Sequence, residues 1–378
     1  MHICMLLLAK YREGNQPVTG VDLQAITQIH ALKDAGHDIT VIAKKRSLDS
    51  KIHEVLDGVN VYRIGPSGLY WLWTAIILLK KRRQFNAVYL LGQRFATLEA
   101  ILLCRLLDIP TILKFPISLK QFTWRQFHEI LILKLKNFIS RQASAYHVIS
   151  TDIANQLIAA GFYQERIKRV PNGVDMDRFS VTSDKNALRI KLKLPLDKKI
   201  VVYSGRLIPR KGFDIALDAW PKIYAAYPDA HFVVVGGGPK ESVASLEQLA
   251  DKVGRDTITY VGPVSDVAPY LAASDIYLFP SRREGLPNAL LEAMSCGCAC
   301  VASDIGGCVD LIIPEKTGLL FPSGDAQAMA EAAIQLLHDE SLIQTVSQNA
   351  HSLIAAEYEL HSVIERLINL YCTLSTKS

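Results

Sequence analysis

The sequence predicts an α/β fold with two doubly wound, Rossmann-like domains that face a central cleft. At 378 residues the chain is long for one hydrophobic core, and with 49% apolar residues each half can bury a core of its own. Short apolar runs of strand length alternate with helix-like stretches, which is typical of a parallel sheet covered on both faces. A polar, charged stretch at residues 180–199 interrupts this alternation once. In such sheets, ligands bind at the carboxyl ends of the strands.

The first alternation begins at the first residues of the chain. A polar loop at residues 10–19 follows the first apolar run, and Gly20 then precedes a helix with Val21, Ala25 and Ile29 on one face. The strands expected in this half are Ile3–Leu8, Ile39–Ala43, Val59–Ile64, Ala87–Leu91, Thr111–Phe115 and Tyr146–Ile149.

The second alternation follows the polar stretch. Its expected strands are Ile200–Tyr203, Phe232–Val235, Ile258–Val261, Ile276–Phe279 and Cys300–Ala302, and a tail helix is expected over Glu359–Leu374. We therefore predict a first domain at residues 1–180, a linker at 181–198, a second domain at 199–355 and a terminal helix within 356–378.

The net charge of +5 is unevenly distributed. Residues 1–180 carry 24 Lys and Arg against 14 Asp and Glu, whereas the remainder carries 18 against 23. A basic half can bind nucleic acid, an anionic membrane surface or an anionic substrate. Seven cysteines without a paired pattern favour a reducing compartment. The start lacks a signal-peptide pattern and no apolar run is long enough to span a bilayer, so we expect a cytoplasmic protein, with the inner face of the cytoplasmic membrane as a candidate location.

The stretch from Glu284 to Glu292 predicts an anion site. It follows the apolar run Ile276–Phe279, and a helix is expected from Asn288 to Ser295. Between the two glutamates stand Gly285, Leu286, Pro287, Asn288 and Ala289, and Pro287 suits the first turn of the helix. The amides of a helix N-terminus bind phosphate, and carboxylates accept hydrogen bonds from sugar hydroxyls. The structural alternative is a surface helix with two solvated glutamates, which leaves the glycine–proline loop without a purpose.

A second motif follows the first strand of the second domain. It runs from Gly205 to Gly212 and places Arg206 and Lys211 on a turn held by Pro209. Two fixed cations at the carboxyl edge of a sheet can neutralise a diphosphate leaving group without a metal ion. By itself, the motif fits a solvated basic turn equally well.

Together these motifs resemble family four of the retaining glycosyltransferases, which have the GT-B fold. The matching residues are Gly205-Arg206-Leu207 with Lys211-Gly212, Glu284 with seven residues before Glu292, Val170–Asp175 with Phe179, Val235–Pro239, and Thr317–Leu320. The resemblance covers the second domain densely and the first only loosely.

The resemblance implies a metal-independent hexosyltransferase that uses a nucleotide-diphosphate sugar, with UDP preferred to GDP, and no cofactor. It implies that Arg206 and Lys211 bind the diphosphate and that Glu284 holds the sugar. The remaining donor-binding candidates are Gly20, Gly205, the stretch from Gly285 to Ala289, and Glu292, which would bind the ribose hydroxyls. It also implies that the tail helix crosses back onto the first, acceptor-side domain. The expected role is the assembly of a cell-surface glycan or glycolipid.

Two positions depart from the family pattern. Thr19-Gly20 stands where many members have two glycines, and Leu113–Ser118 lacks the histidine that many carry after the fifth strand. Lys114 and Ser118 are the candidates for acceptor-side residues in its place.

Several other interpretations fit less well. Gly236–Gly238 lacks the third glycine of a dinucleotide fingerprint. Cys296, Cys298 and Cys300 alternate along a strand and are expected to be buried thiols rather than metal ligands. Asp175-Met176-Asp177 falls in a turn and is expected to be structural. The alternatives in function are a nucleotide-sugar epimerase or phosphorylase of the same fold and a basic nucleic-acid-binding protein, although no nucleic-acid partner is expected because the cations are not interleaved with aromatic residues.

Two apolar stretches with basic ends are candidates for contact with an anionic membrane. Leu69–Leu79 precedes four cations at Lys80–Arg83, and the helix expected at Arg125–Arg141 mixes leucine and phenylalanine with lysine. Apolar runs of this length are more often core helices. The acceptor that these stretches favour is a lipid-linked or anionic glycan.

Overall fold

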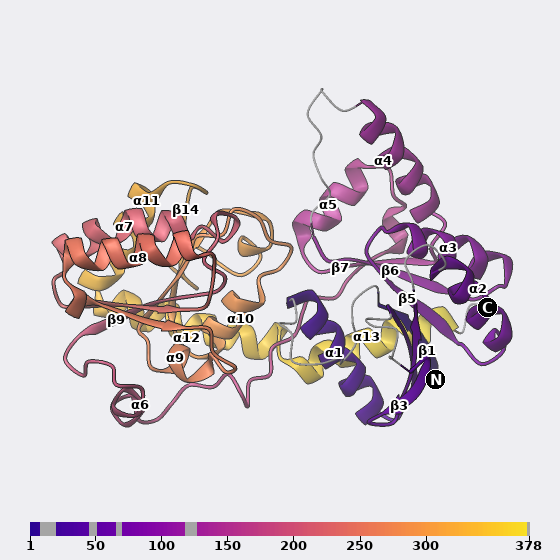
Figure 1. Ribbon diagram of the computed structural model, residues 1–378, viewed down its shortest axis with the longest axis horizontal. Helices are drawn as coiled ribbons and strands as arrows, with labels where there is room; N and C mark the ends of the chain where they lie inside the picture. Colours follow the sequence, from indigo (N-terminus) through magenta and orange to yellow (C-terminus); the bar gives the residue numbers. More distant parts are fainter. Residues whose placement is uncertain (8–19, 45–50, 66–69, 118–126, 376–378) are drawn as a thin grey trace. The chain divides into compact units, whose positions relative to one another are not determined.

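The computed structural model describes residues 1–7, 20–44, 51–65, 70–117 and 127–375 (Figure 1). The chain divides into two compact units. Unit 1 comprises Met1–Asn172 and His361–Ser378, and unit 2 comprises Gly173–Leu360. Each unit is built on a sheet of its own, as the two alternations predict.

Unit 1 contains an eight-stranded sheet in the order β3-β4-β2-β1-β5-β6-β7-β8. All neighbours pair in parallel except β3 and β4, which are antiparallel. The strands are β1 His2–Leu6, β2 Asp38–Lys44, β3 His53–Leu56, β4 Val59–Ile64, β5 Ala87–Leu91, β6 Thr111–Phe115, β7 Ala145–Val148 and β8 Ile167–Arg169. The six predicted strands are confirmed to within two residues at each described end, and β3 and β8 are additional edge strands.

The helices of unit 1 connect these strands. They are α1 Gly20–Asp34, α2 Tyr70–Lys81, α3 Phe95–Leu106, α4 Phe127–Ser140, α5 Thr151–Ala159 and the last helix, α13 Leu360–Ser375. Helix α13 contributes Val363, Leu367 and Tyr371 to the same core as Ile29 of α1 and Tyr89 of β5. The prediction that the tail helix returns to the first domain is therefore confirmed.

Unit 2 contains a six-stranded parallel sheet in the order β11-β10-β9-β12-β13-β14. The strands are β9 Lys199–Ser204, β10 Ala230–Val235, β11 Ile258–Gly262, β12 Ile276–Phe279, β13 Ala299–Ser303 and β14 Leu319–Phe321. From β9 the chain builds outward through β10 and β11, and from β12 it builds outward in the opposite direction. The order therefore reverses between β9 and β12, and such a switch point is where doubly wound sheets bind ligands.

The helices of unit 2 are α6 Lys185–Leu192, α7 Phe213–Ala226, α8 Lys240–Val253, α9 Ala268–Ala272, α10 Asn288–Ser295, α11 Ala326–His338 and α12 Glu340–Glu357. Among the described residues, four single 3₁₀ turns complete the two units: η1 Gln164–Arg166, η2 Pro209–Lys211, η3 Arg255–Thr257 and η4 Gly306–Cys308. The core of unit 2 lies between the sheet and helices α7, α8, α11 and α12, and its largest fully buried side chain is that of Trp220.

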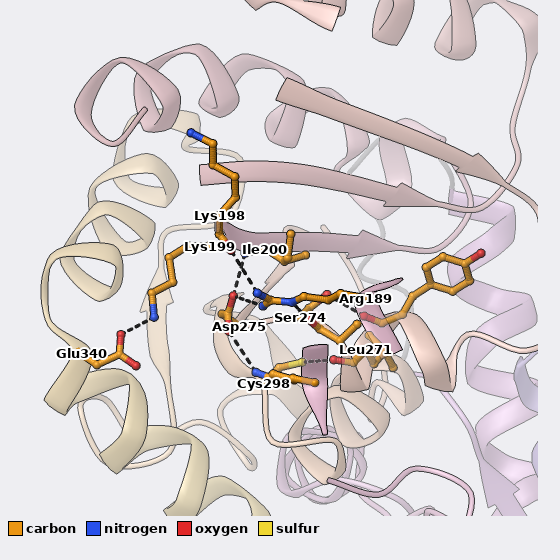
Figure 2. A network of polar contacts seen from close by, with 12 residues as sticks. Arg189, Lys198, Lys199, Ile200, Leu271, Ser274, Asp275, Cys298 and Glu340 are labelled. Atoms are coloured by element: carbon orange, nitrogen blue, oxygen red, sulfur yellow. Dashed lines mark hydrogen bonds and ion pairs between the residues drawn. The ribbon is translucent and has the colours of Figure 1, made fainter. Parts of the chain in front are cut away.

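The segment expected to be a linker is folded into unit 2. Helix α6 lies within it, and the guanidinium of Arg189, 6% exposed, donates to Asp275 at 2.7 Å and to the Ala273 carbonyl at 3.0 Å. Asp275 also accepts from Lys185 at 3.0 Å and from the Ile200 amide at 2.8 Å. Figure 2 shows Asp275 beside Arg189 and Ile200. The charges that suggested a solvated linker form a half-buried network that fixes α6 to the start of the sheet.

Candidate functional site

The two predicted motifs meet at the switch point of unit 2. The loop after β9 and the loop after β12 are in direct contact. The Arg282 amide donates to the Arg210 carbonyl at 3.0 Å, and the Ser281 hydroxyl oxygen lies 3.3 Å from the same carbonyl. Between them, Gly212 approaches so closely that a β-carbon there would lie 1.7 Å from the Pro280 carbonyl oxygen. Gly212 is therefore required for the two loops to touch.

A half-buried ion pair joins the two loops through their side chains. The Lys211 amine donates to Glu284 Oε1 at 2.6 Å, and the two side chains are 24% and 15% exposed. The Ser281 hydroxyl donates to the same carboxylate oxygen at 2.7 Å, and Arg210 lies 3.9 Å from it. The structure therefore brings Lys211 and Glu284 together and fixes the carboxylate with two hydrogen bonds.

Arg206 is placed differently from Lys211. Its side chain is exposed, and its guanidinium has no hydrogen-bond or ion-pair partner among the described residues. Its backbone is held, because the buried Tyr203 hydroxyl donates to the Arg206 carbonyl at 2.9 Å. The result is a fixed main chain that carries a cation able to bind an anion in solvent.

The glycine run after β10 supports the Arg206 loop. The Leu207 amide donates to the Gly237 carbonyl at 3.0 Å. A β-carbon on Gly236 would lie 1.9 Å from the Gly205 carbonyl oxygen, and one on Gly238 would lie 2.6 Å from Leu207. These glycines serve the close packing of two loops, which agrees with the absence of a dinucleotide fingerprint.

Helix α10 begins directly after the Glu284 loop. Its first residue is Asn288, and Pro287 is the extended residue before it, so the expectation that Pro287 lies in the first helical turn is wrong by one position. The extended region is accessible to proline, whose ring fixes only φ. The first turn of α10, which includes Ala289, presents its amides and the positive end of the helix dipole directly after the loop residues Gly285 and Leu286. As predicted, the helix ends at Ser295, and Gly297 has φ +77°.

The loop after β13 provides a residue that the motifs did not indicate. A β-carbon on Gly307, in the 3₁₀ turn η4, would lie 2.1 Å from the Gly285 carbonyl oxygen and 2.7 Å from the Leu286 α-carbon. Gly307 therefore fixes the path of the Glu284 loop. The only sequence signal for it is the pair Gly306-Gly307 after an apolar strand.

Glu292 lies on α10, half-buried, on the turn below Asn288. Burial raises the pKa of Glu292 to about 7, against the opposing effects of Arg178 and Lys211. Arg178 pairs with Asp266 at 2.9 Å and is a second residue that the motifs did not indicate. A carboxyl with this pKa changes its charge near neutral pH.

The remaining candidates belong to unit 1. Gly20 begins α1 in unit 1, and Ser118 lies outside the described residues. Lys114 is buried in β6, 4% exposed, where its amine donates to Asn172 at 3.3 Å, and burial lowers its pKa to about 7. Neutral Lys114 is therefore well populated at physiological pH.

The residues expected to be structural have structural contacts. Asp175 accepts from the amides of Asp177 and Arg178, both at 3.1 Å, which closes the turn predicted there. The three cysteines at 296–300 are buried free thiols. In the part of the chain that the structure describes, no three His, Cys, Asp or Glu side chains gather into a metal site.

Two protein-family models match the chain. "Glycosyltransferase Family 4" matches residues 18–178, and "Glycosyl transferases group 1" matches residues 198–339. The two matches fall on the two halves of the chain, and the second includes the loops after β9 and β12.

Curated relatives match over part of the chain. A GDP-mannose-dependent monoacylated α-(1-6)-phosphatidylinositol monomannoside mannosyltransferase of Corynebacterium glutamicum is 33% identical over 54% of this chain and 55% of its own length. A UDP-Gal:α-D-GlcNAc-diphosphoundecaprenol α-1,3-galactosyltransferase of Escherichia coli is 29% identical over 54% of each. The chain thus spans about half the length of these relatives.

Solved structures match over the whole chain. HepE of Anabaena, solved in complex with UDP, has a TM-score of 0.80 at 20% identity and covers 99% of this chain and 100% of its own. The sucrose-phosphate synthase of Thermosynechococcus elongatus has a TM-score of 0.80 at 21% identity and covers 100% of both chains. These likenesses confirm the predicted fold class of two parallel-sheet α/β domains.

Proposed function

Since this chain belongs to family four of the glycosyltransferases and has the GT-B fold, we propose that it transfers a hexose from a nucleotide-diphosphate sugar to an acceptor hydroxyl with retention of configuration. The observation that carries the proposal is the group at the switch point of unit 2. There, an exposed Arg206 with no partner among the described side chains stands on the loop that also carries Lys211, and Lys211 contacts Glu284 at 2.6 Å.

Donor binding is divided among three kinds of group. Arg206, Lys211 and the first amides of α10 bind the diphosphate, since two cations and a helix N-terminus favour anionic oxygens. Glu284 accepts hydrogen bonds from the sugar hydroxyls. Glu292, one turn further along α10, accepts hydrogen bonds from the ribose. Because Lys211 contacts Glu284 directly, the leaving group and the sugar are held next to each other.

The rate acceleration in this proposal is electrostatic. As the bond from the sugar to the diphosphate breaks, negative charge grows on the leaving group, and positive charge grows on the sugar ring. Preorganised cations stabilise the first, and the fixed carboxylate of Glu284 stabilises the second. The residues supply this stabilisation without a metal ion, and we propose that none is required.

The acceptor side is assigned to unit 1. We propose a lipid-linked or anionic glycan acceptor and a location at the inner face of the cytoplasmic membrane. This is supported by the lipid-linked acceptors in the names of the two relatives and by the excess of cations in residues 1–180. Lys114 and Ser118 remain the proposed acceptor-side residues. No helix in the described part of the chain is long and apolar enough to cross a membrane.

The test is a screen of nucleotide sugars in the absence of acceptor, with release of nucleoside diphosphate as the readout. We expect slow hydrolysis of one donor, with UDP-sugars preferred to GDP-sugars, and loss of this hydrolysis in Arg206→Ala. Arg255→Ala is the matched control, because Arg255 is exposed and pairs only with the neighbouring Asp251 among the described residues. Failure of every donor to be hydrolysed or bound would overturn the proposal, and equal losses in both variants would remove Arg206 from the site.

A further inference from the structure

We propose that unit 1 docks onto an anionic lipid bilayer through one surface formed by helices α2, α3 and α4. We define this α2–α4 surface by its exposed apolar side chains, which are Trp71, Leu72, Trp73, Leu79, Phe95, Leu102, Leu106, Leu131, Ile132, Leu135 and Phe138. The purpose of this docking rests on the proposed function, because an enzyme that acts on a lipid-linked acceptor benefits from being held at the bilayer. The binding itself is independent of the chemistry.

Helix α3 presents an apolar stripe outward. Phe95, Leu102 and Leu106 lie at positions i, i+7 and i+11 and therefore on one face. Phe95 is 71% exposed and Leu106 is 82% exposed, which is unusual for side chains of this size when they recur on a single helix face. Glu99 lies on the same stripe, and partial burial raises its pKa.

Helix α4 continues the stripe. Leu131, Leu135 and Phe138 lie at i, i+4 and i+7, and Leu131 is 63% exposed. The opposite side of α4 is fixed to the unit, because Gln93 donates at 3.0 Å to both Asn137 and Ser140. The Lys136 amine lies 5.4 Å from the centroid of the Phe95 ring, so a cation of α4 reaches the exposed stripe of α3.

Helix α2 lies beside α3 and adds the two tryptophans. Only Tyr70, Thr74 and Leu78 of α2 are buried, and these three occupy the face that turns to the core. Trp71 and Trp73 are each nearly half exposed. Helix α2 therefore packs as a core helix on one face only. Tryptophan favours the boundary between lipid headgroups and acyl chains, where one edge of the ring is apolar and the other is hydrated. Figure 1 shows α2, α3 and α4 following one another along one side of unit 1.

Cations accompany the apolar side chains. The described side chains of residues 70–83, 94–108 and 131–141 include nine Lys or Arg but only two acids, Glu99 and Asp108. A cluster of four, Lys80–Arg83, spans the end of α2. An apolar surface with a basic rim complements a bilayer that carries anionic headgroups. A second copy of this chain is a poorer occupant, because two-fold pairing would bring like charges together.

The experiment is cosedimentation of the whole chain with vesicles of phosphatidylcholine, either alone or with phosphatidylglycerol. At 0.1 M salt we expect binding to the anionic vesicles and little to the neutral ones, and binding should weaken at 0.5 M salt because the surface charges are screened. The triple variant Lys80→Gln, Arg82→Gln, Arg83→Gln should lose about 100-fold in partition coefficient. The triple variant Leu106→Ser, Leu135→Ser, Phe138→Ser should lose at least about tenfold.

Matched controls lie elsewhere on the molecule. Lys191→Gln, Lys252→Gln, Lys316→Gln removes three exposed cations of unit 2, and Val55→Ser, Ile190→Ser, Leu196→Ser removes three exposed apolar side chains. Both controls should bind vesicles as the parent chain does. Losses as large in the controls as in the surface variants would overturn the proposal, as would equal binding to both kinds of vesicle or to neither.

Two further measurements separate this inference from its rivals. Sedimentation velocity without lipid reports self-association: a dimer that the Leu106, Leu135 and Phe138 variant dissociates would assign the surface to a second copy instead. Hydrolysis of the donor without acceptor should be unchanged in both surface variants. If donor hydrolysis is absent while anionic vesicles still bind, the proposed function falls and the docking surface stands; if hydrolysis occurs without vesicle binding, the reverse holds.

Discussion

The contrast between Lys211 and Arg206 gives a quantitative prediction, because the two cations have different surroundings. Lys211 pairs with Glu284, and both side chains are less than a quarter exposed. Replacing Lys211 by alanine leaves Glu284 with the Ser281 hydroxyl at 2.7 Å and Arg210 at 3.9 Å. An exposed ion pair contributes about 1 kcal/mol or less, and breaking a fully buried one costs roughly 3–5 kcal/mol. We therefore expect Lys211→Ala to lower the free energy of unfolding by about 2 kcal/mol.

A second substitution, at Glu284, tests the cause of this stability loss. Unit 2 spans Gly173–Leu360, and for a unit of this size about 2 kcal/mol corresponds to roughly 4–8 °C in Tm. Adding Glu284→Gln to Lys211→Ala should restore most of the Tm, because the unpaired carboxylate is removed, but it should not restore activity. Arg206→Ala should leave the Tm within about 1 °C, because the Arg206 side chain is exposed and its guanidinium has no hydrogen-bond or ion-pair partner in the part of the chain that the structure describes.

Lys211→Ala and Arg206→Ala should show the same change in steady-state kinetics. Each removes a preorganised cation from the leaving diphosphate, which costs about 3–4 kcal/mol in the transition state, or 100- to 1000-fold in kcat, with a smaller effect on donor affinity. Steady-state kinetics and thermal melting of the four proteins measure all of this. The reasoning would be refuted by a Lys211→Ala variant with unchanged Tm and unchanged kcat, or by an Arg206→Ala variant that alters KM alone.

Three further predictions concern other parts of the site. Glu292→Gln should raise KM for the donor with little change in kcat. In addition, because the pKa of Glu292 is raised from 4.5 to about 7, the folded state keeps this proton to a higher pH than the unfolded state does. The free energy of unfolding should therefore fall by up to about 3 kcal/mol as pH rises from about 4.5 to about 7. Urea titrations should show this fall in the parent chain, and its presence in Glu292→Gln as well would contradict the assignment. Gly307→Ala should raise donor KM and lower the Tm, because a β-carbon would collide with the Gly285 carbonyl. Gly237→Ala is the control and should behave nearly as the parent chain does, because its β-carbon would make only ordinary contacts at 3.6 Å. Thermal melts and donor titrations measure both effects, and a milder effect at Gly307 than at Gly237 would contradict the loop packing. Turnover in excess chelator should equal turnover without it, and a loss that magnesium or manganese restores would show that the diphosphate needs a metal.

The sheets were predictable because their signals are local. Ala87–Leu91 and Ile276–Phe279 are apolar along their whole length, as strands buried on both faces must be, and Thr111–Phe115 is apolar except for Thr111 and Lys114. The structure has all three strands at those bounds. The Lys211–Glu284 contact was predictable in part, since both residues follow strands and the carboxyl ends of parallel strands share one edge.

What the sequence did not reveal depends on partners distant along the chain. The charged segment around α6 looks like a linker until Arg189 is seen to pair with Asp275, 86 residues away. The role of Gly307 depends on the Gly285 carbonyl, which only the folded loop brings within reach. The outward face of α3 has the apolar content of a core helix, and its exposure follows from which elements cover it.

The central claim is that the switch point of unit 2 holds a nucleotide-diphosphate sugar and assists the departure of its diphosphate. The most direct measurement is the kcat and donor KM of Arg206→Ala, Lys211→Ala, Glu284→Gln and Glu292→Gln, each first shown by thermal melting to be folded. The account predicts a division: the first three lower kcat, because their charges face those that develop in the transition state, whereas Glu292→Gln raises KM with kcat nearly unchanged. If all four raised KM equally and left kcat untouched, the site would bind a nucleotide sugar without assisting the transfer, and the account would be contradicted.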